Sequence, residues 1–312
     1  MRHSNETVQK ILTLHEAGMK SRKIANAVFG RSSCKSTVND IIARHRKDKP
    51  TIHINKAKIA FLDVESQGTV ALTHGRFKTN ISPKAVISEP HLLSYAVNWS
   101  SDDEHDVECY SLADFDYFNT NPKDDILIVE QLWDILNDAD LVVCHNVGFD
   151  KNIINARFAY HGIEPPSPYQ TVCTLQGLRK YFRLPANSLD AATRYFELER
   201  KLDNAGIGLW LRCYEDDRQA YQEMKDYNVG DLPTLRQLYY RILPFLENHP
   251  NMGHYNEGGC RRCGSKSLTP IEGKYKMTSV SKFQAYRCGD CGSVQRTRKN
   301  ENAKEVMNNL YM

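Results

Sequence analysis

The sequence of 312 residues has no long apolar run. No stretch approaches the roughly 18 to 20 consecutive apolar residues that span a bilayer. Residues 1–6 are polar and lack the apolar stretch of a secretory signal. We therefore expect a cytoplasmic protein with no membrane partner. Its hydrophobic content of 41% and charged content of 25% are typical of a globular chain and exclude a disordered one.

Without a secretion signal, disulfides are not expected, although there are nine cysteines. Four of them form two C-x-x-C pairs, and the other five are widely scattered and interpreted as reduced thiols: Cys34, Cys109, Cys144, Cys173 and Cys213.

The net charge is small, at +3, but it is unevenly distributed. Residues 1–58 hold 13 Lys and Arg against 4 Asp and Glu, and residues 259–312 hold 11 against 4. The stretch between them holds 17 against 30. Basic ends and an acidic middle suit a protein that attracts phosphate at its ends and gathers carboxylates for metal ions at its centre.

The N-terminal segment, residues 1–48, predicts three short helices. The first runs from Asn5 or Glu6 to about Ala17, the second begins near Ser21, and the third begins at Ser36, a good N-cap. Short helices joined by a Gly-containing turn resemble a helix-turn-helix of the resolvase and transposase type. Its expected DNA contacts are Lys35, Arg44 and Arg46. The alternative is a small helical bundle that binds protein.

Residues 49–58 are polar and basic and are interpreted as a linker. From residue 59 to 255 strands come first, at 59–62, 92–99 and 107–112. A buried strand at 141–144 then alternates with helices expected near 125–137, 150–161, 188–196 and 216–246. This order predicts an α/β domain with a central mixed sheet. A glycine-rich turn separates it from a cysteine-rich tail, residues 256–312.

Acidic residues recur at three places in this domain. Asp63 and Glu65 end the first strand, and side chains two apart share one face, where two carboxylates repel unless a cation lies between them. Asp150 ends the run His-Asn-Val-Gly-Phe-Asp after a buried strand, where open α/β sheets place their sites. Tyr227 and Asp231 are four apart and so share one face of a helix. Each piece alone has an ordinary structural explanation, such as helix capping for Asp150.

The order D-x-E, N-x-x-F-D and Y-x-x-x-D resembles the three motifs of the DEDD exonuclease superfamily, in its tyrosine branch. The resemblance covers roughly residues 56–246. Residues 187–196, with Leu209 and Trp210, also resemble phage-encoded predicted exonucleases that carry a zinc-ribbon tail. The resemblance implies an RNase H-like fold and 3′→5′ exonuclease activity on DNA, acting on single strands or 3′ ends. It further suggests a replication or repair polymerase as partner, and the host cytoplasm as location if a phage encodes the chain.

The resemblance also implies a mechanism with two divalent ions. One would be held by Asp63, Glu65 and Asp231, and the other by Asp63 and Asp150. Tyr227 would orient the attacking water, and the products would be nucleoside 5′-monophosphates. The ions are expected to be Mg²⁺ or Mn²⁺, because an all-oxygen site favours hard cations. Asn146 and Phe149 are expected to contact nucleic acid.

The tail predicts a structural zinc site. Cys260 and Cys263 precede Cys288 and Cys291 by 24 intervening residues, and two such pairs supply the four thiolates of one tetrahedral ion. Between and after them lie basic and aromatic residues that could hold single-stranded nucleic acid, or whose aromatics could simply form the small core: Arg261, Arg262, Tyr275, Lys282, Phe283, Tyr286, Arg287, Arg296 and Arg298.

Three other functions remain open from the sequence. A transposase or integrase also joins a helix-turn-helix to an RNase H-like fold, but it lacks the Glu after the first Asp and the Y-x-x-x-D motif. An exoribonuclease would use the same tetrad, because sugar selection depends on other contacts. A non-catalytic DNA-binding protein is disfavoured because all five site residues are present.

Overall fold

The computed structural model describes residues 5–16, 19, 21–30, 34, 35, 37–39, 41, 56–75, 77, 80–198 and 206–308. The chain divides into two compact units, residues 1–51 and residues 52–312. Within the described residues, no helix is both long and apolar enough to cross a membrane.

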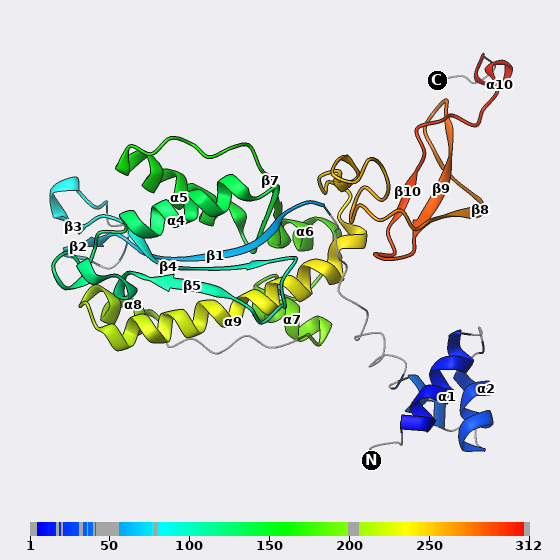
Figure 1. Ribbon diagram of the computed structural model, residues 1–312, viewed down its shortest axis with the longest axis horizontal. Coiled ribbons are helices and arrows are strands. Elements are labelled where there is room, and N and C mark those ends of the chain that lie inside the picture. Colours follow the sequence, from blue (N-terminus) through cyan, green and yellow to red (C-terminus); the bar gives the residue numbers. More distant parts are fainter. Residues whose placement is uncertain are drawn as a thin grey trace. The chain divides into compact units, whose positions relative to one another are not determined.

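The first unit packs helix α1 (Asn5–Glu16) against helix α2 (Ser21–Phe29), as the sequence predicts (Figure 1). Residues 37–39 are helical, in the region where a third helix is expected. The described core of the unit contains Ile11, Ile24, Ala25, Val38 and Ile41. Of the expected DNA contacts, Lys35 is exposed, whereas Arg44 and Arg46 lie outside the described residues.

The second unit is built on a five-stranded sheet of order β5-β4-β1-β6-β7. Strands β1 (Ile59–Gln67), β4 (His91–Trp99) and β5 (Glu108–Ser111) are antiparallel, while β6 (Leu141–Cys144) and β7 (Gln170–Cys173) run parallel to β1. The predicted α/β architecture with a central mixed sheet is therefore confirmed, and it is consistent with an RNase H-like fold.

Helices cover both faces of this sheet, because β1 and β4 are apolar on both sides. One core contains apolar side chains of α4 (Ile126–Asp138) and α5 (Val147–His161). The other contains those of α6 (Thr174–Tyr181), α7 (Leu189–Phe196) and the later turns of α9. Helix α9 (Arg218–Ile242) runs along the sheet in Figure 1.

The remaining elements are short or peripheral. Helix α8 (Ile207–Tyr214) packs on α9, and the two-stranded sheet of β2 (Val70–Ala71) and β3 (Val86–Ser88) follows β1. The C-terminal region forms an antiparallel sheet of β8 (Leu268–Met277), β9 (Lys282–Cys288) and β10 (Val294–Arg296). Helix α10 (Lys304–Asn308) follows it.

A buried ion pair ties α4, α5 and β4 together. Both oxygens of Asp125, which is fully buried, accept hydrogen bonds at 2.7 Å from Arg157 of α5. The same carboxylate contacts His161 at 2.7 Å and accepts from the backbone N–H of Leu92 at 2.8 Å. Breaking such a pair by removing one partner leaves an uncompensated buried charge, so the network fixes the position of α5 against the sheet.

Candidate active site and cysteine cluster

Strand β1 changes from buried to half-buried where its acids begin. Residues Ile59–Leu62 are buried, whereas Asp63 and Glu65 are half-buried. Because alternate residues of a strand share a face, both acids lie on the face of Phe61. The Phe61 ring packs edge-on against Tyr239 of α9, with centroids 5.5 Å apart. The acids therefore lie on the face of the sheet that α9 covers.

Asp150 lies in the first turn of α5 and is only 3% exposed. Its Oδ1 accepts a hydrogen bond from the backbone N–H of Val64 at 3.3 Å, and Val64 stands between Asp63 and Glu65 in the chain. Burial raises the pKa of Asp150 to about 7, and the bond from Val64 opposes that shift. Burial makes the charged form of this carboxyl unfavourable, and a cation beside it would stabilise that form.

Asn146 joins β6 to α5 in the left-handed conformation, with φ 90° and ψ 49°. Asn adopts this region more readily than most residues, so the sequence can turn sharply from strand to helix here. The side chains of Asn146 and Phe149 are both exposed in the turn that carries Asp150. Asn146 thus has a conformational role that its assignment as a nucleic-acid contact did not include.

Helix α9 places Tyr227 and Asp231 beside β1, and a hydrogen bond of Asn228, which lies between them in the chain, holds this part of the helix on the sheet. Asn228 is fully buried, and its Nδ2 donates to Oγ of Ser94 at 3.2 Å. Ser94 is the cross-strand partner of Glu65. Tyr227 and Asp231, 9% and 4% exposed, therefore lie on the part of α9 that is held next to the acidic strand.

An aromatic contact holds the ring of Tyr227. Trp210 of α8 packs edge-on against it, with centroids 6.5 Å apart. In the sequence, Trp210 belongs to the part that resembles phage-encoded exonucleases. Its contact with Tyr227, which lies 17 positions later and in another helix, was not predicted.

The four predicted acidic ligands come from three neighbouring elements: Asp63, Glu65, Asp150 and Asp231. Among the described residues, no three of these carboxylates have oxygens that all lie within 4.8 Å of one another. The pKa of the buried Cys144 thiol is raised well above its usual value. Burial is the largest cause, and the negative charges of Asp150 and Asp63 add to it. The two acids thus lie near a common point.

A second group, Asp124, Asp125 and His161, does bring its ligand atoms within that distance. It does not fit a cation, because Arg157 already places its guanidinium on both oxygens of Asp125. This group is the buried ion pair described above. Sequence reasoning missed it; the available signal was an Arg and a His four apart on one face of a predicted helix.

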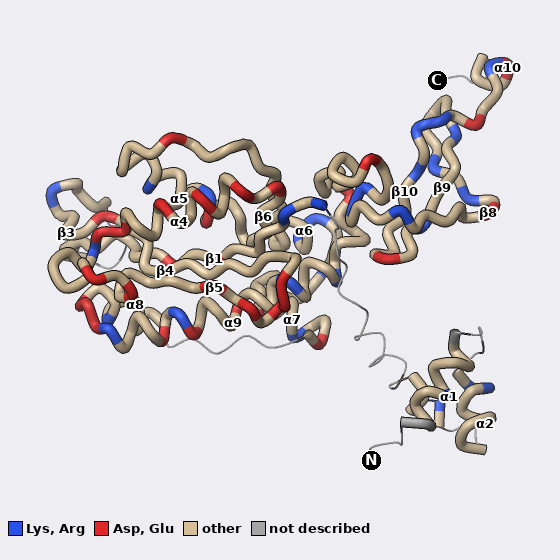
Figure 2. Tube along the Cα trace, in the orientation of Figure 1, with Lys and Arg blue, Asp and Glu red and all other residues tan. Residues whose placement is uncertain are grey.

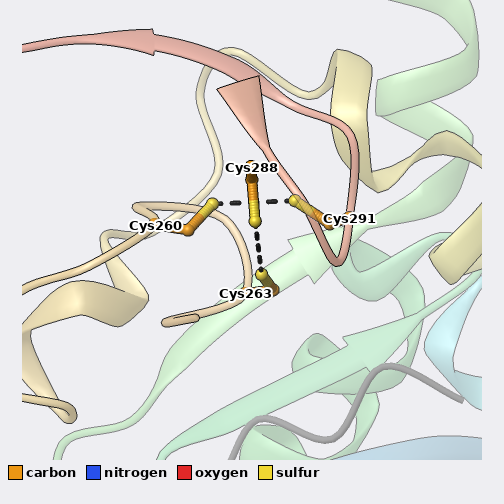
Figure 3. Close-up of side chains that lie close together, drawn as sticks. All are labelled: Cys260, Cys263, Cys288 and Cys291. Atoms are coloured by element: carbon orange, nitrogen blue, oxygen red, sulfur yellow. Dashed lines mark hydrogen bonds between the residues drawn. The ribbon is translucent and has the colours of Figure 1, made fainter. Parts of the chain in front are cut away.

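The four tail cysteines converge from two matching turns (Figure 3). Both turns have the sequence C-x-x-C-G-S, at residues 260–265 and 288–293. In each, the glycine N–H donates to the carbonyl of the first cysteine, at 2.7 Å and 3.0 Å, and the N–H of that cysteine donates to the carbonyl of the serine. Gly264 and Gly292 take φ of 76° and 79°, a region that favours glycine.

The sulfur geometry fits one tetrahedral ion. Sγ atoms of Cys260 and Cys291 lie 3.6 Å apart, as do those of Cys263 and Cys288. Thiolates bound at about 2.3 Å in a tetrahedron stand about 3.8 Å apart, whereas a disulfide requires about 2.05 Å. The cluster is buried and can therefore hold a structural metal ion.

Arg262 lies between the first two cysteines and is only 5% exposed. Within the described chain its Nε and Nη1 have no hydrogen-bond partner. Burial lowers its pKa, while the charge of Cys260 raises it. Four thiolates around one divalent ion carry a net charge of −2, which would add to the charge of Glu247 in compensating the buried guanidinium. The unbonded Nε and Nη1 beside the cysteines support the assignment of a metal to them.

The cysteine cluster belongs to the same apolar core as the later turns of α9. That core also includes Tyr239, Leu243, Leu246 and Met252. The Tyr239 hydroxyl bonds Nε2 of His249 at 2.9 Å, and burial lowers the pKa of His249 to about 4, so its ring is neutral near pH 7. Loss of the metal would therefore disturb the packing at the end of α9.

No protein-family model matches the sequence, and no curated protein matches it. Among solved structures, the chain is similar to the "Crystal structure of the Mos1 Strand Transfer Complex", with 10% identity over 78% of this chain and 77% of that chain. The TM-score is 0.16, so this likeness carries no argument about fold or function.

The raised pKa of Asp150 predicts a pH-dependent effect of Asp150→Asn on stability without added metal. The folded-state pKa of about 7 exceeds the ordinary aspartate pKa of 3.8, so the folded chain binds the extra proton between these values and loses stability as pH rises through them. Asn removes that loss. We expect the melting temperature of the variant to exceed that of wild type by a few degrees at pH 8 and to equal it near pH 4.

Added Mg²⁺ or Mn²⁺ should then raise the melting temperature of wild type at pH 8 by more than that of Asp150→Asn, because the variant keeps all the ligands of only one of the two ions. Calorimetry over the pH range measures both effects. Asp134→Asn, at an exposed acid of α4, is the matched control. A variant that melts below wild type at pH 8 would contradict the assigned environment of Asp150.

The shared core predicts that removing zinc destabilises the sheet domain as well as the tail. All three tryptophans, Trp99, Trp133 and Trp210, precede residue 256, so tryptophan fluorescence reports on the sheet domain alone. We expect a zinc-selective chelator to lower the thermal midpoint of wild type by several degrees, because a structural ion contributes folding free energy.

Cys263→Ser should lose the bound zinc, measured by mass spectrometry, and should melt at a temperature that the chelator no longer shifts. Cys213→Ser, at an equally buried thiol outside the cluster, should keep both the zinc and the response to chelator. A fluorescence midpoint that stays constant while zinc is stripped from wild type would show that the two regions are uncoupled.

Proposed function

We propose that this chain is a metal-dependent nuclease that removes nucleoside 5′-monophosphates from the 3′ end of DNA. The observation that carries the proposal is the buried carboxyl of Asp150, hydrogen-bonded at 3.3 Å to the backbone between Asp63 and Glu65. The order of the three motifs along the chain, which resembles the DEDD exonucleases, supports both the reaction and its polarity.

A set of four carboxylates repels a phosphodiester, so the site can act on nucleic acid only with cations. Asp63, Glu65 and Asp231 would hold one divalent ion, and Asp63 with Asp150 would hold another; oxygen ligands favour Mg²⁺ or Mn²⁺. When bound, such ions offset the charge of the phosphate and lower the pKa of the attacking water. Asp63 and Glu65 are half-buried, so part of each side chain is accessible to solvent.

The other residues of the site position the reactants. Tyr227 would bond the attacking water through its hydroxyl, while the edge contact with Trp210 restricts the ring to one orientation. Asn146 and Phe149 are exposed beside Asp150 and would contact the terminal nucleotide. A hydroxyl held in place is effective because orientation is settled before the reaction begins.

Two further assignments accompany the proposal. The cysteine cluster would bind one structural Zn²⁺, in accord with its sulfur spacing of 3.6 Å and its burial. The helices of residues 1–48 would bring the chain to DNA, with exposed Lys35 as one contact.

Activity should depend on the acids and on added metal. Full-length protein is incubated with 5′-labelled single-stranded DNA, duplex DNA or RNA, with and without Mg²⁺ or Mn²⁺. We expect stepwise shortening of DNA from the 3′ end only when metal is added. Asp63→Asn and Asp150→Asn should each lower the rate at least about 100-fold, because an ion contributes several kcal/mol to the transition state.

The exposed acid Asp134, changed to Asn, is the control and should retain the wild-type rate. Full activity in both site variants would refute the proposed site. Shortening of RNA but not of DNA would identify RNA as the substrate. Shortening from the 5′ end would show that the direction of digestion is 5′→3′.

Tyr227→Phe should have a smaller effect than loss of an acid. Removing one hydrogen bond to a charged group is equivalent to about 10- to 100-fold in rate, and the carboxylates stay in place. The decrease should appear in kcat with KM nearly unchanged. Tyr195→Phe, at a tyrosine that is 58% exposed on α7, should leave kcat unaltered. A Tyr227→Phe enzyme with wild-type kcat would remove Tyr227 from the mechanism.

A further inference from the structure

The register of the C-terminal sheet separates its side chains into two faces. Lys276 pairs with Phe283, and Arg296 pairs with Ala285. Paired residues and alternate residues of a strand share a face. One face, here called the cationic face, therefore carries Lys276, Phe283, Ala285, Arg287, Val294 and Arg296. The opposite face carries Tyr275, Met277, Lys282, Gln284, Tyr286 and Gln295.

Ring contacts agree with this division. The Arg296 guanidinium lies 3.7 Å from the ring centroid of Phe283, both on the cationic face. The Lys282 ammonium lies 3.8 Å from the ring centroid of Tyr275, both on the opposite face. Each pair lies across neighbouring strands, as the pairing register requires.

The paired positions of the cationic face contain no acid, and Glu272 of β8 lies in the irregular part of the register between Pro270 and Tyr275. Lys276, Arg287 and Arg296 are all exposed and come from β8, β9 and β10 respectively. None of the paired strand residues is Asp or Glu. Figure 2 shows Lys and Arg spread over these strands, whereas both signs of charge alternate along the elements of the sheet domain.

This arrangement changes the surface that the sequence suggested. Arg262 is buried at the cysteines and cannot belong to it. Phe283 is 9% exposed beneath Arg296, so it is core rather than a stacking platform. Tyr275 and Tyr286 lie on the opposite face. Among the described residues of the tail, the exposed arginines therefore have no exposed aromatic ring on their face of the sheet for a base to stack on.

The two arginines are held in place before any ligand binds. Arg287 donates from Nη1 to the carbonyl of Gly292 at 3.1 Å, next to the second cysteine turn. Arg296 is fixed by the ring of Phe283 and by a bond from its Nη1 to the carbonyl of Thr297 at 3.3 Å. Each guanidinium keeps further N–H groups for an anion, and little side-chain entropy is lost on binding.

The size of the cationic face suits a polyanion. Lys276 and Arg296 are two strand spacings apart, about 10 Å, with β9 between them. Phosphates recur at every nucleotide of a strand, so a face of this width can contact more than one of them. A single small anion would use only one of these cations.

We propose that the cationic face, through Lys276, Arg287 and Arg296, binds the sugar-phosphate backbone of nucleic acid without reading its bases. This inference extends the proposed nuclease function and rests on it for the class of ligand. It assigns the tail a role in retaining substrate, with affinity that depends on salt and not on sequence.

The test is a binding titration with full-length protein and no added divalent metal, so it does not depend on cleavage. Anisotropy is measured with a labelled 30-base-pair duplex and with oligo(dT) at several salt concentrations. Lys276→Gln combined with Arg287→Gln should raise Kd at least about tenfold at 0.1 M salt and lower the slope of log K against log salt by about 1.8 for duplex. Arg296 is left intact because it covers Phe283.

The control combines Lys282→Gln, on the opposite face, with Lys266→Gln, which precedes β8 and bonds the carbonyl of Glu257. It removes the same charge and should leave the slope unchanged. Equal losses in both double variants, or none in either, would overturn the proposal. Tighter competition by polyglutamate than by either oligonucleotide would identify an acidic protein as the ligand instead. Binding that fails while metal-dependent cleavage persists would leave the nuclease proposal standing.

Discussion

The contact of α9 with the central sheet is the constraint on which both candidate metal sites depend. It is secured by Arg236, a guanidinium only 2% exposed that bonds Asn98 Oδ1 at 2.6 Å and the carbonyls of Trp99 and Asp102 at 3.0 Å each. Neutral acceptors rather than a carboxylate bind its Nη1 and Nη2, and these bonds hold the helix against the end of β4 and the turn after it. One turn and more toward the N-terminus, the same helix carries Asp231 and Tyr227.

Helix α9 also explains how an oxygen site and a sulfur site occur in one compact unit. Its middle faces the acids of β1, and its last turns share an apolar core with the cysteines. Two of the four acids, Asp63 and Glu65, are half-buried, whereas all four cysteines are buried. A closed shell of four thiolates is typical of a structural metal site.

The sequence predicted elements whose pattern is local. Strand β1, helix α5 and helix α9 follow from apolar runs and caps, and the two cysteine turns follow from their spacing. Strand β7, only four residues with an exposed Gln170, and helix α8, with Ile207 and Leu211 exposed, lack that periodicity and were not predicted. The bond of Asp125 to Arg157 joins positions 32 apart, and the burial of Arg262 depends on its docking, so neither has a local signal. The four acids of the candidate site were identified from the order of the motifs. The distances between their oxygens depend on side-chain rotamers, which the sequence does not determine.

The core shared by the cysteines and α9 has an evolutionary consequence. Zinc modules are often regarded as portable units that recombination can attach to or remove from a host domain. Here a crossover at residue 256 would remove the cysteines that pack in one core with Leu243, Leu246 and Met252, and would expose an apolar patch on the sheet domain. Exchange of the tail alone would therefore destabilise the host domain, whereas transfer of α9 together with the cysteines would keep this core intact.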